Sequence, residues 1–167
     1  MNTFYQPPPP ELSPFVDRIW GWESDSSEAI PLPTLLPGTG AELYFHYGEP
    51  FRTEPKDGMP STFDRGHLFC IRKVPIELMQ LSGVGFIAVR FKIGMLHRFT
   101  RIPAESLVDC QLAVEDIWGI SGARLLQQLS YATGRQEMIA LINGFLASNL
   151  QTDSVDYLVE LGMPLLY

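Results

Sequence analysis

Hydrophobic and polar residues alternate along the first part of the chain and follow a helical spacing in the last part. The alternating stretches are rich in β-branched and aromatic residues and predict strands at residues 15–22, 41–47, 67–72, 76–81 and 84–91. After residue 109, apolar positions recur at helical spacing and predict helices over residues 121–131, capped by Ser121, and 136–149, with a last periodic segment over 155–162. Strands followed by helices indicate an α+β fold, in which a small β-barrel or sandwich packs against C-terminal helices.

Turn-forming residues define the connections between these elements. Five prolines within residues 1–14 favour an extended proline-rich arm over a packed element, with an SH3-type ligand as the alternative. Residues 48–66 hold three Pro and three Gly and predict a loop. Gly94 ends the strand that begins at residue 84, a short helix follows, and Pro103 suits the first position of a second helical turn. The chain therefore divides into an arm (1–14), a strand region (15–111) and a helical region (112–167).

Composition narrows the class of protein. A hydrophobic content of 46% with 11% aromatic residues is typical of a globular domain. The formal net charge of −7 argues against sequence-independent binding to nucleic acid and against an anionic membrane surface. No apolar run approaches the length of a membrane span, and the N-terminus lacks the basic start and apolar core of an export signal. With two cysteines outside any CxxC pattern, we expect a cytoplasmic protein with reduced thiols.

Motifs of known catalytic and metal chemistry do not occur in the sequence. The histidines show no HxH or HExxH spacing, no GxSxG turn is present, and no Walker loop or GxGxxG occurs. We therefore expect no catalytic residues, no metal and no cofactor. A metal site assembled from residues that are distant in sequence stays open as an alternative.

A set of polar and aromatic residues on the predicted strands is the strongest candidate for a binding site. Arg90 interrupts an apolar strand, and a charge in such a position needs a partner or a ligand. If one face of the barrel points inward, a small-molecule site with few polar anchors results. The alternative is that the aromatic residues fill the core while Glu42 and Arg90 pair with each other or lie exposed at the rim. The candidate ligand-binding residues are Trp20, Trp22, Glu42, Tyr44, His46, Phe69 and Arg90.

Four segments in this order resemble the N-terminal domain of a group of AraC-type bacterial transcription regulators. The segments are PFVDRIWGWE (14–23), LLPGTGAELYFHYGEPF (35–51), VGFIAVRFKIGMLHRFTRIPAESLVD (84–109) and VEDIWG (114–119). The resemblance implies a cupin-like β-barrel followed by helices, which senses an effector or mediates self-association. In full-length relatives a C-terminal pair of helix-turn-helix units reads DNA, and the residues after 150 are too few to hold such a pair.

The resemblance therefore predicts a regulatory domain that contacts DNA only through a part missing from this chain. We expect a small-molecule effector, a homodimer and no membrane partner. One alternative is a stand-alone protein-interaction module, which binds a partner through the predicted helices at 121–131 and 136–149. The other is a cupin-type metalloenzyme. The residues predicted to form the self-association face are Leu125, Leu129, Met138, Ile142 and Phe145.

Overall fold

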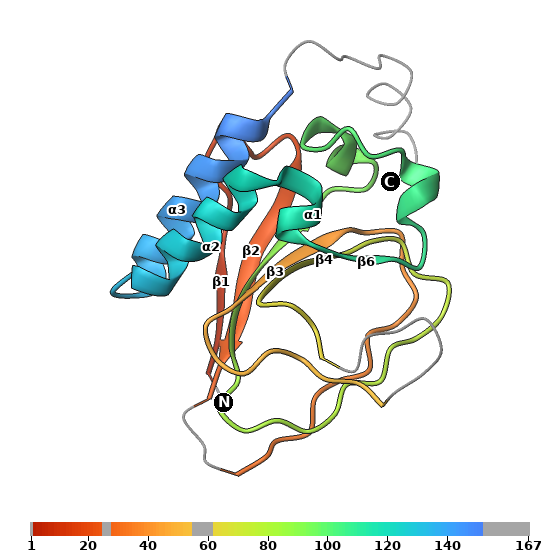
Figure 1. Cartoon of the computed structure of the whole chain (residues 1–167), viewed down its shortest axis with the longest axis vertical. Coiled ribbons are helices and arrows are strands. Elements are labelled where there is room, and N and C mark those ends of the chain that lie inside the picture. The colour runs from red at the N-terminus through yellow and green to blue at the C-terminus, as the bar shows by residue number, and fades with distance from the viewer. Residues whose placement is uncertain (1, 25–27, 55–61, 152–167) are drawn as a thin grey trace.

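A computed structural model describes residues 2–24, 28–54 and 62–151 of the chain. Within these residues the chain forms an antiparallel sheet followed by helices, in the α+β order that the sequence predicts (Figure 1). The sheet has six strands in the order β1-β2-β5-β3-β4-β6, and each strand pairs antiparallel with its neighbour. The strands are β1 (Asn2–Gln6), β2 (Val16–Glu23), β3 (Glu42–His46), β4 (Gly66–Phe69), β5 (Gly85–Phe91) and β6 (Gln111–Ala113).

The helical elements follow β5 along the chain. Two short 3-10 helices precede β6, and three α-helices follow it. Figure 1 shows α2 and α3 running alongside one another. The bounds are η1 (Met95–Arg98), η2 (Ala104–Leu107), α1 (Val114–Trp118), α2 (Ile120–Tyr131) and α3 (Arg135–Asn149). None of the helices in the described ranges has both the length and the apolar character that a bilayer crossing requires.

The two faces of the sheet pack against different layers, because successive side chains of a strand point to opposite sides. One face packs against α2 and α3, and Leu43, Leu68 and Val89 from the strands meet Leu125 and Ile142 from the helices in one hydrophobic cluster. The other face packs against the long connections between strands, which lie in the lower half of Figure 1. The molecule is therefore a three-layer arrangement of helices, sheet and irregular connections.

The sheet does not close into the β-barrel that the sequence predicts. Strands β1 and β6 are the two edges of the sheet and do not pair with each other, so the sheet is open. The segment at residues 76–81, which alternation predicts to be a strand, makes only isolated bridges through Ile76, Leu78 and Leu81. These bridges join connection to connection, so the face opposite the helices is covered without a second continuous sheet.

The N-terminal segment also differs from the expectation of an extended arm. Asn2–Gln6 forms the edge strand β1, paired along its length with Ile19–Glu23 of β2. Arg135 of α3 lies with its guanidinium carbon 4.5 Å from the centre of the Phe4 ring and pairs with Glu23 at 3.1 Å. Contacts with β2 and α3 thus hold β1, which precedes the run of prolines at residues 7–10.

The remaining sequence predictions agree with the structure within a few residues. Strands β2, β3, β4 and β5 and helices α2 and α3 all occur where the pattern places them. Ser121 does not cap α2; its hydroxyl donates to the carbonyl of Trp118 at 2.8 Å, and the helix begins at Ile120 after Gly119. The periodic segment at 155–162 lies outside the described residues.

Candidate functional site

The seven predicted ligand-binding residues all lie on the sheet face that the helices do not cover. They occupy even-numbered positions of β2, β3 and β5, and Phe69 of β4 shares their side because it pairs with Glu42. Two residues that the prediction did not include, His67 and Phe86, lie on the same face. We call Trp20, Trp22, Tyr44, His46, His67, Phe69 and Phe86 the aromatic face.

Tyr44 lies at the centre of the aromatic face. Its ring meets those of Phe69, Phe86 and Trp20 at centroid distances of 5.5, 5.4 and 6.1 Å, in edge-on or tilted arrangements. Such geometries let the positive edge of one ring meet the negative face of another. The side chains of the aromatic face therefore form one connected cluster, not isolated pockets of contact.

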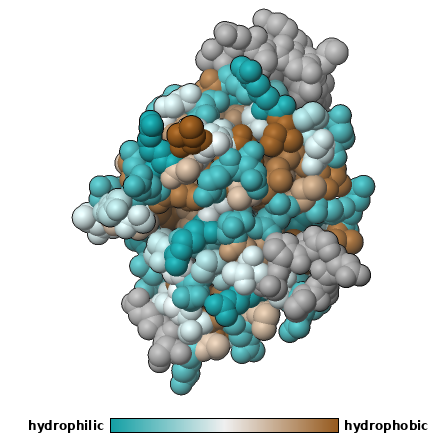
Figure 2. Space-filling view, in the orientation of Figure 1, coloured by the Kyte–Doolittle hydropathy of each residue, from teal (hydrophilic) through white to brown (hydrophobic). Residues whose placement is uncertain are grey.

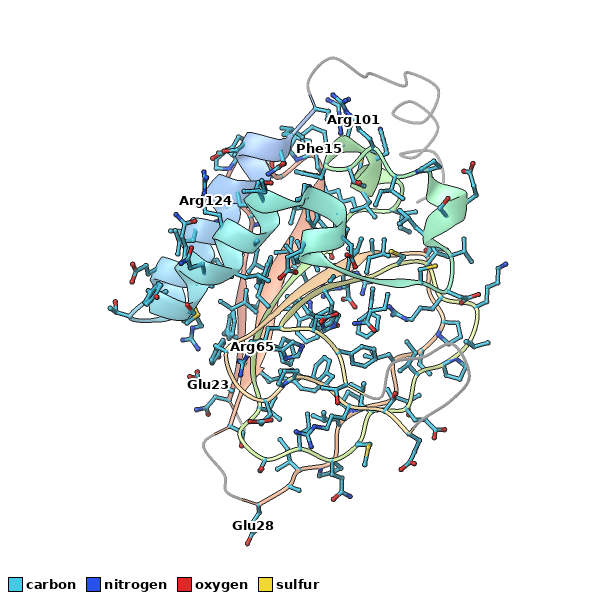
Figure 3. The ribbon with its side chains drawn as sticks, viewed as in Figure 1. Phe15, Glu23, Glu28, Arg65, Arg101 and Arg124 are labelled. Carbon is cyan, nitrogen blue, oxygen red and sulfur yellow. The ribbon has the colours of Figure 1, made fainter. Side chains whose placement is uncertain are left out.

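The connections between strands cover the aromatic face. Phe51 and Phe63 are buried against it, and Phe51 contacts Tyr44 and Phe86 at 5.5 and 5.2 Å between ring centroids. Figure 3 shows side chains from the strands and from the lower connections filling the space between them. The cover is built largely from irregular chain, which is the part of a fold that most readily opens for a ligand.

Two histidines sit within this cluster on neighbouring strands. The rings of His46 and His67 are stacked with centroids 5.1 Å apart, and the ring of His67 also stacks on Tyr44 at 5.4 Å. His67 lies directly opposite Tyr44 in the β3–β4 register. Sequence reasoning named His46 but missed His67, because the register between β3 and β4 is not visible in either strand alone.

Both imidazoles are neutral because burial disfavours their charged forms. Burial lowers the pKa of His67 to about 4, and its Nδ1 lies 2.8 Å from the carbonyl oxygen of Asp64. If Nδ1 donates to this carbonyl, Nε2 is left as an acceptor. Burial also lowers the pKa of His46 well below its usual value, with smaller contributions from His67 and Arg65.

Several buried polar atoms of the aromatic face have no hydrogen-bond partner among the described residues. They are Trp20 Nε1, both ring nitrogens of His46, and Nε2 of His67. His46 is 7% exposed and His67 is fully buried, so bulk water does not readily serve them. A buried polar group without a partner costs about 1–3 kcal/mol, so these atoms mark a position where a bound molecule would gain hydrogen bonds at little desolvation cost to the protein.

Glu42 and Arg90 form a charged pair at one end of the aromatic face. Arg90 Nη1 lies 3.2 Å from Glu42 Oε1, and the hydroxyl of Tyr44 donates to Glu42 Oε2 at 3.0 Å. Burial, followed by the charge of Glu42, raises the pKa of Tyr44 well above its usual value, so the phenol keeps its proton. The charge of Arg90, for which the sequence predicts a partner or a ligand, is therefore paired with Glu42 of the same sheet.

The structure adds Arg72 to the surroundings of the aromatic face. Its guanidinium carbon lies 5.5 Å from the centre of the Phe69 ring, and Nη1 is buried without a hydrogen-bond partner among the described residues. Sequence reasoning missed Arg72 because it ends a predicted strand at an ordinary surface position.

Within the described ranges, no group of three or more His, Cys, Asp or Glu side chains is placed to hold a metal ion. His46 and His67 supply two neighbouring imidazoles.

Cys70 is buried, and burial raises the pKa of its thiol to about 12, which makes it a poor nucleophile.

The predicted self-association stripe is partly used inside the fold. Leu125 and Ile142 are buried in the cluster beneath the helices, and their part in self-association stays a prediction. Leu129, Met138 and Phe145 are half-buried and pack against the same cluster. The large apolar side chains that α2 exposes are Ile120 and Tyr131, at 80% and 77% exposure. Figure 2 shows hydrophobic atoms, in brown, on the upper half of the face of the molecule that is turned to the viewer, where the helices lie in Figure 1.

These features define an α+β protein with an open antiparallel sheet, one face of which holds buried polar and aromatic side chains. The chain belongs to the family described as Domain of unknown function (DUF6597), which matches residues 5–113. The match begins within β1 and ends at the last residue of β6, so it spans the sheet and stops where α1 begins. No curated protein and no solved structure matches the chain.

Proposed function

We propose that this chain is the ligand-sensing domain of an AraC-type transcription regulator and that its aromatic face binds a small-molecule effector. The observation that carries the proposal is the group of buried nitrogens on Trp20, His46 and His67 without partners among the described residues. A fold that only needed a core at this position would gain stability from apolar side chains of similar shape.

The chemistry of the site supports binding over catalysis. Both histidines have lowered pKa values, and His67 at about 4 is far from the value that suits a general base at neutral pH. Tyr44 keeps its proton, and the Cys70 thiol is held in its neutral form by burial. Neutral hydrogen-bonding groups among aromatic rings are typical of sites that hold an organic molecule without changing it.

The regulatory role rests on the resemblance of four segments to AraC-type N-terminal domains. In this proposal the DNA contacts belong to a helix-turn-helix part outside this chain, so the formal net charge of −7 is no obstacle. The protein would act in the cytoplasm, where Cys70 and Cys110 stay free thiols. The codons that follow codon 167 in the gene test this role: a basic double helix-turn-helix would support it, and a stop codon would favour a stand-alone interaction module.

The binding role is tested with a thermal-shift screen of small heteroaromatic and aromatic compounds. We expect compounds that raise the melting temperature of the wild type to lose their effect on His46→Phe, which fills the same space without ring nitrogens. His97→Gln is the matched control, because His97 lies in η1 with its Nδ1 directed to the Gly94 carbonyl. Equal responses of wild type and His46→Phe to every compound would rule out His46 as a ligand contact.

Self-association is the second part of the proposal. The exposed Ile120 and Tyr131 lie at the two ends of α2, on a helix whose other side is committed to the core. A homodimer that buries both would remove large apolar side chains from water. Two-fold symmetric dimers, in which both subunits use the same surface, are the commonest homo-oligomers.

A further inference from the structure

We infer that the effector carries an acidic group and that Arg72, not Arg90, binds it. This inference rests on the proposed function and narrows the effector to an organic acid with a flat apolar body. The argument compares the two arginines that flank the aromatic face.

Arg90 belongs to a charge cluster that is already balanced. Its guanidinium lies 3.2 Å from Glu42 and 3.9 Å from Asp17, and Asp17 also pairs with Arg18 at 3.0 Å. Two carboxylates thus face two guanidiniums. An anionic ligand at Arg90 would meet the repulsion of these two carboxylates, and one of them, Glu42, is buried and also held by Tyr44.

Arg72 has no carboxylate partner among the described residues. Its Nε and Nη2 both donate to the carbonyl of Leu36 at 3.3 Å, which is long for a hydrogen bond. A backbone bridge between Gly38 and Arg72 sets this contact. Asp109, on a segment bonded to Ile71, accepts instead from the backbone N–H of Lys73 at 2.6 Å. Nη1 of Arg72 is left buried, with no hydrogen-bond partner in the part of the chain that the structure describes.

The positive charge of Arg72 reaches the aromatic face. Its guanidinium lies over Phe69, and the Phe69 ring in turn contacts Tyr44 and His67 at 5.5 and 4.8 Å between centroids. The charge of Arg72 acts to lower the pKa values of Tyr44 and Cys70, against the larger effect of burial. Arg65 also acts on the pKa of His46, and its Nη1 donates to the carbonyl of Gly48 at 3.3 Å. Among the described residues, Arg72 is the cation whose guanidinium lies over a ring of the aromatic face.

The placement of these groups selects a ligand with two features. A flat apolar ring suits the rings of Tyr44, Phe69 and His67, and an acidic oxygen at its end would accept from Arg72 Nη1. Hydrogen bonds from a guanidinium to a carboxylate are about twice as strong as neutral ones, and a planar acid matches the planar donor group.

The experiment measures binding of three probes by calorimetry or ligand-observed NMR: benzoate, its uncharged counterpart benzamide, and acetate. Fragments of this size bind in the millimolar range, with Kd values of about 1 mM. We expect benzoate to bind wild type at least about tenfold more tightly than either benzamide or acetate, as the gain from a charge-assisted hydrogen bond implies.

Variants identify the residue responsible. Arg72→Met should weaken benzoate by about tenfold and weaken benzamide much less, because the benzamide carbonyl accepts only a weaker hydrogen bond from the guanidinium. Arg72→Lys should keep part of the benzoate affinity. Arg124→Met removes an equal charge from the exposed side of α2, labelled in Figure 3, and should change neither probe. Far-UV circular dichroism of each variant confirms folding before titration.

The outcomes separate the inference from the proposed function. Benzamide binding as tightly as benzoate, or benzoate affinity lost in Arg90→Met but kept in Arg72→Met, overturns the role of Arg72 and leaves the aromatic face as a binding site. Failure of all three probes to bind the wild type counts against the aromatic face as a site for such molecules, and therefore against both.

Discussion

Glu42 Oε1 lies 3.2 Å from Nη1 of Arg90, and the two residues are direct partners in the register of β3 and β5. Glu42 is buried, whereas the side chain of Arg90 is 40% exposed. Arg90, near the end of β5, therefore lies partly in solvent with its charge turned toward a buried carboxylate. This pairing accounts for a charge that the strand pattern alone leaves unexplained.

Removing Glu42 should cost more than removing Arg90. Glu42→Ala leaves the buried hydroxyl of Tyr44 without its acceptor, so we expect a loss of about 1–3 kcal/mol in the free energy of unfolding. Arg90→Met should cost about 1 kcal/mol or less, because the exposed side of the guanidinium is screened by water. Urea unfolding of both single variants and the double variant measures the coupling. A coupling energy of zero would show that the pair contributes nothing to stability.

Acid should destabilise the protein through its buried histidines. The pKa of His67 is about 4 in the folded state against 6.5 in the unfolded chain, so the unfolded chain takes up the proton first as pH falls. Stability is therefore complete above about pH 6.5 and declines toward about pH 4, by roughly 3 kcal/mol for His67. His46 acts in the same direction.

Urea unfolding of wild type and His67→Phe across this pH window isolates the effect from that of the carboxylates. The difference in unfolding free energy between the two proteins should shift in favour of His67→Phe as pH falls. A constant difference across the window would show that His67 does not titrate between the folded and unfolded states.

Alanine should have opposite effects at two glycines. A Cβ at Gly21 of β2 would overlap the backbone oxygen of Phe86 and lie 2.6 Å from Phe4 Cζ, whereas one at Gly144 of α3 meets nothing within 4 Å. We expect Gly21→Ala to cost about 2–3 kcal/mol and Gly144→Ala to add about 0.5–1 kcal/mol. Thermal melting of both variants checks the signs. A neutral Gly21→Ala would contradict the close approach of the Phe86 carbonyl and the Phe4 ring to Gly21.

The two thiols should differ in reactivity. Cys70 is buried with a pKa raised to about 12, whereas Cys110 is half-buried. We expect iodoacetamide at neutral pH to modify Cys110 first, with Cys70 protected until the protein unfolds. Mass spectrometry of peptides after brief labelling measures both sites, and Cys110→Ser should show almost no labelling in the native state. Faster modification of Cys70 would contradict its burial.

Self-association through α2 should depend on its exposed apolar residues. Tyr131→Arg places a charge where the proposed dimer buries an aromatic ring, so we expect a shift from dimer toward monomer. Sedimentation over a range of concentrations measures the shift, and Arg124→Met serves as a control on the same helix. A wild type that stays monomeric at high concentration would exclude this homodimer.

The sequence by itself determined the elements with strong, local patterns. Alternation located β2, β3 and β5. The helical spacing of Leu125 and Leu129 located α2, and that of Ile142 and Leu146 located α3. Burial on one face imposes a period on the apolar residues, and a single segment reveals that period. The same period put Trp20, Glu42, Tyr44, His46 and Arg90 on matching sides of their strands. Proline content, in contrast, hid β1, whose strand character depends on pairing with β2.

The tertiary structure decided what these segments do together. Sheet order left β1 and β6 as unpaired edges, so the expected barrel is open. The β3–β4 register brought His67 beside His46, and the bridge from Gly38 placed Arg72 over Phe69. Packing also buried Leu125 and Ile142, which the helical pattern alone marked as a surface for a partner. Strand pairing and burial depend on contacts between segments that are far apart in the sequence, and no single stretch of sequence carries that information.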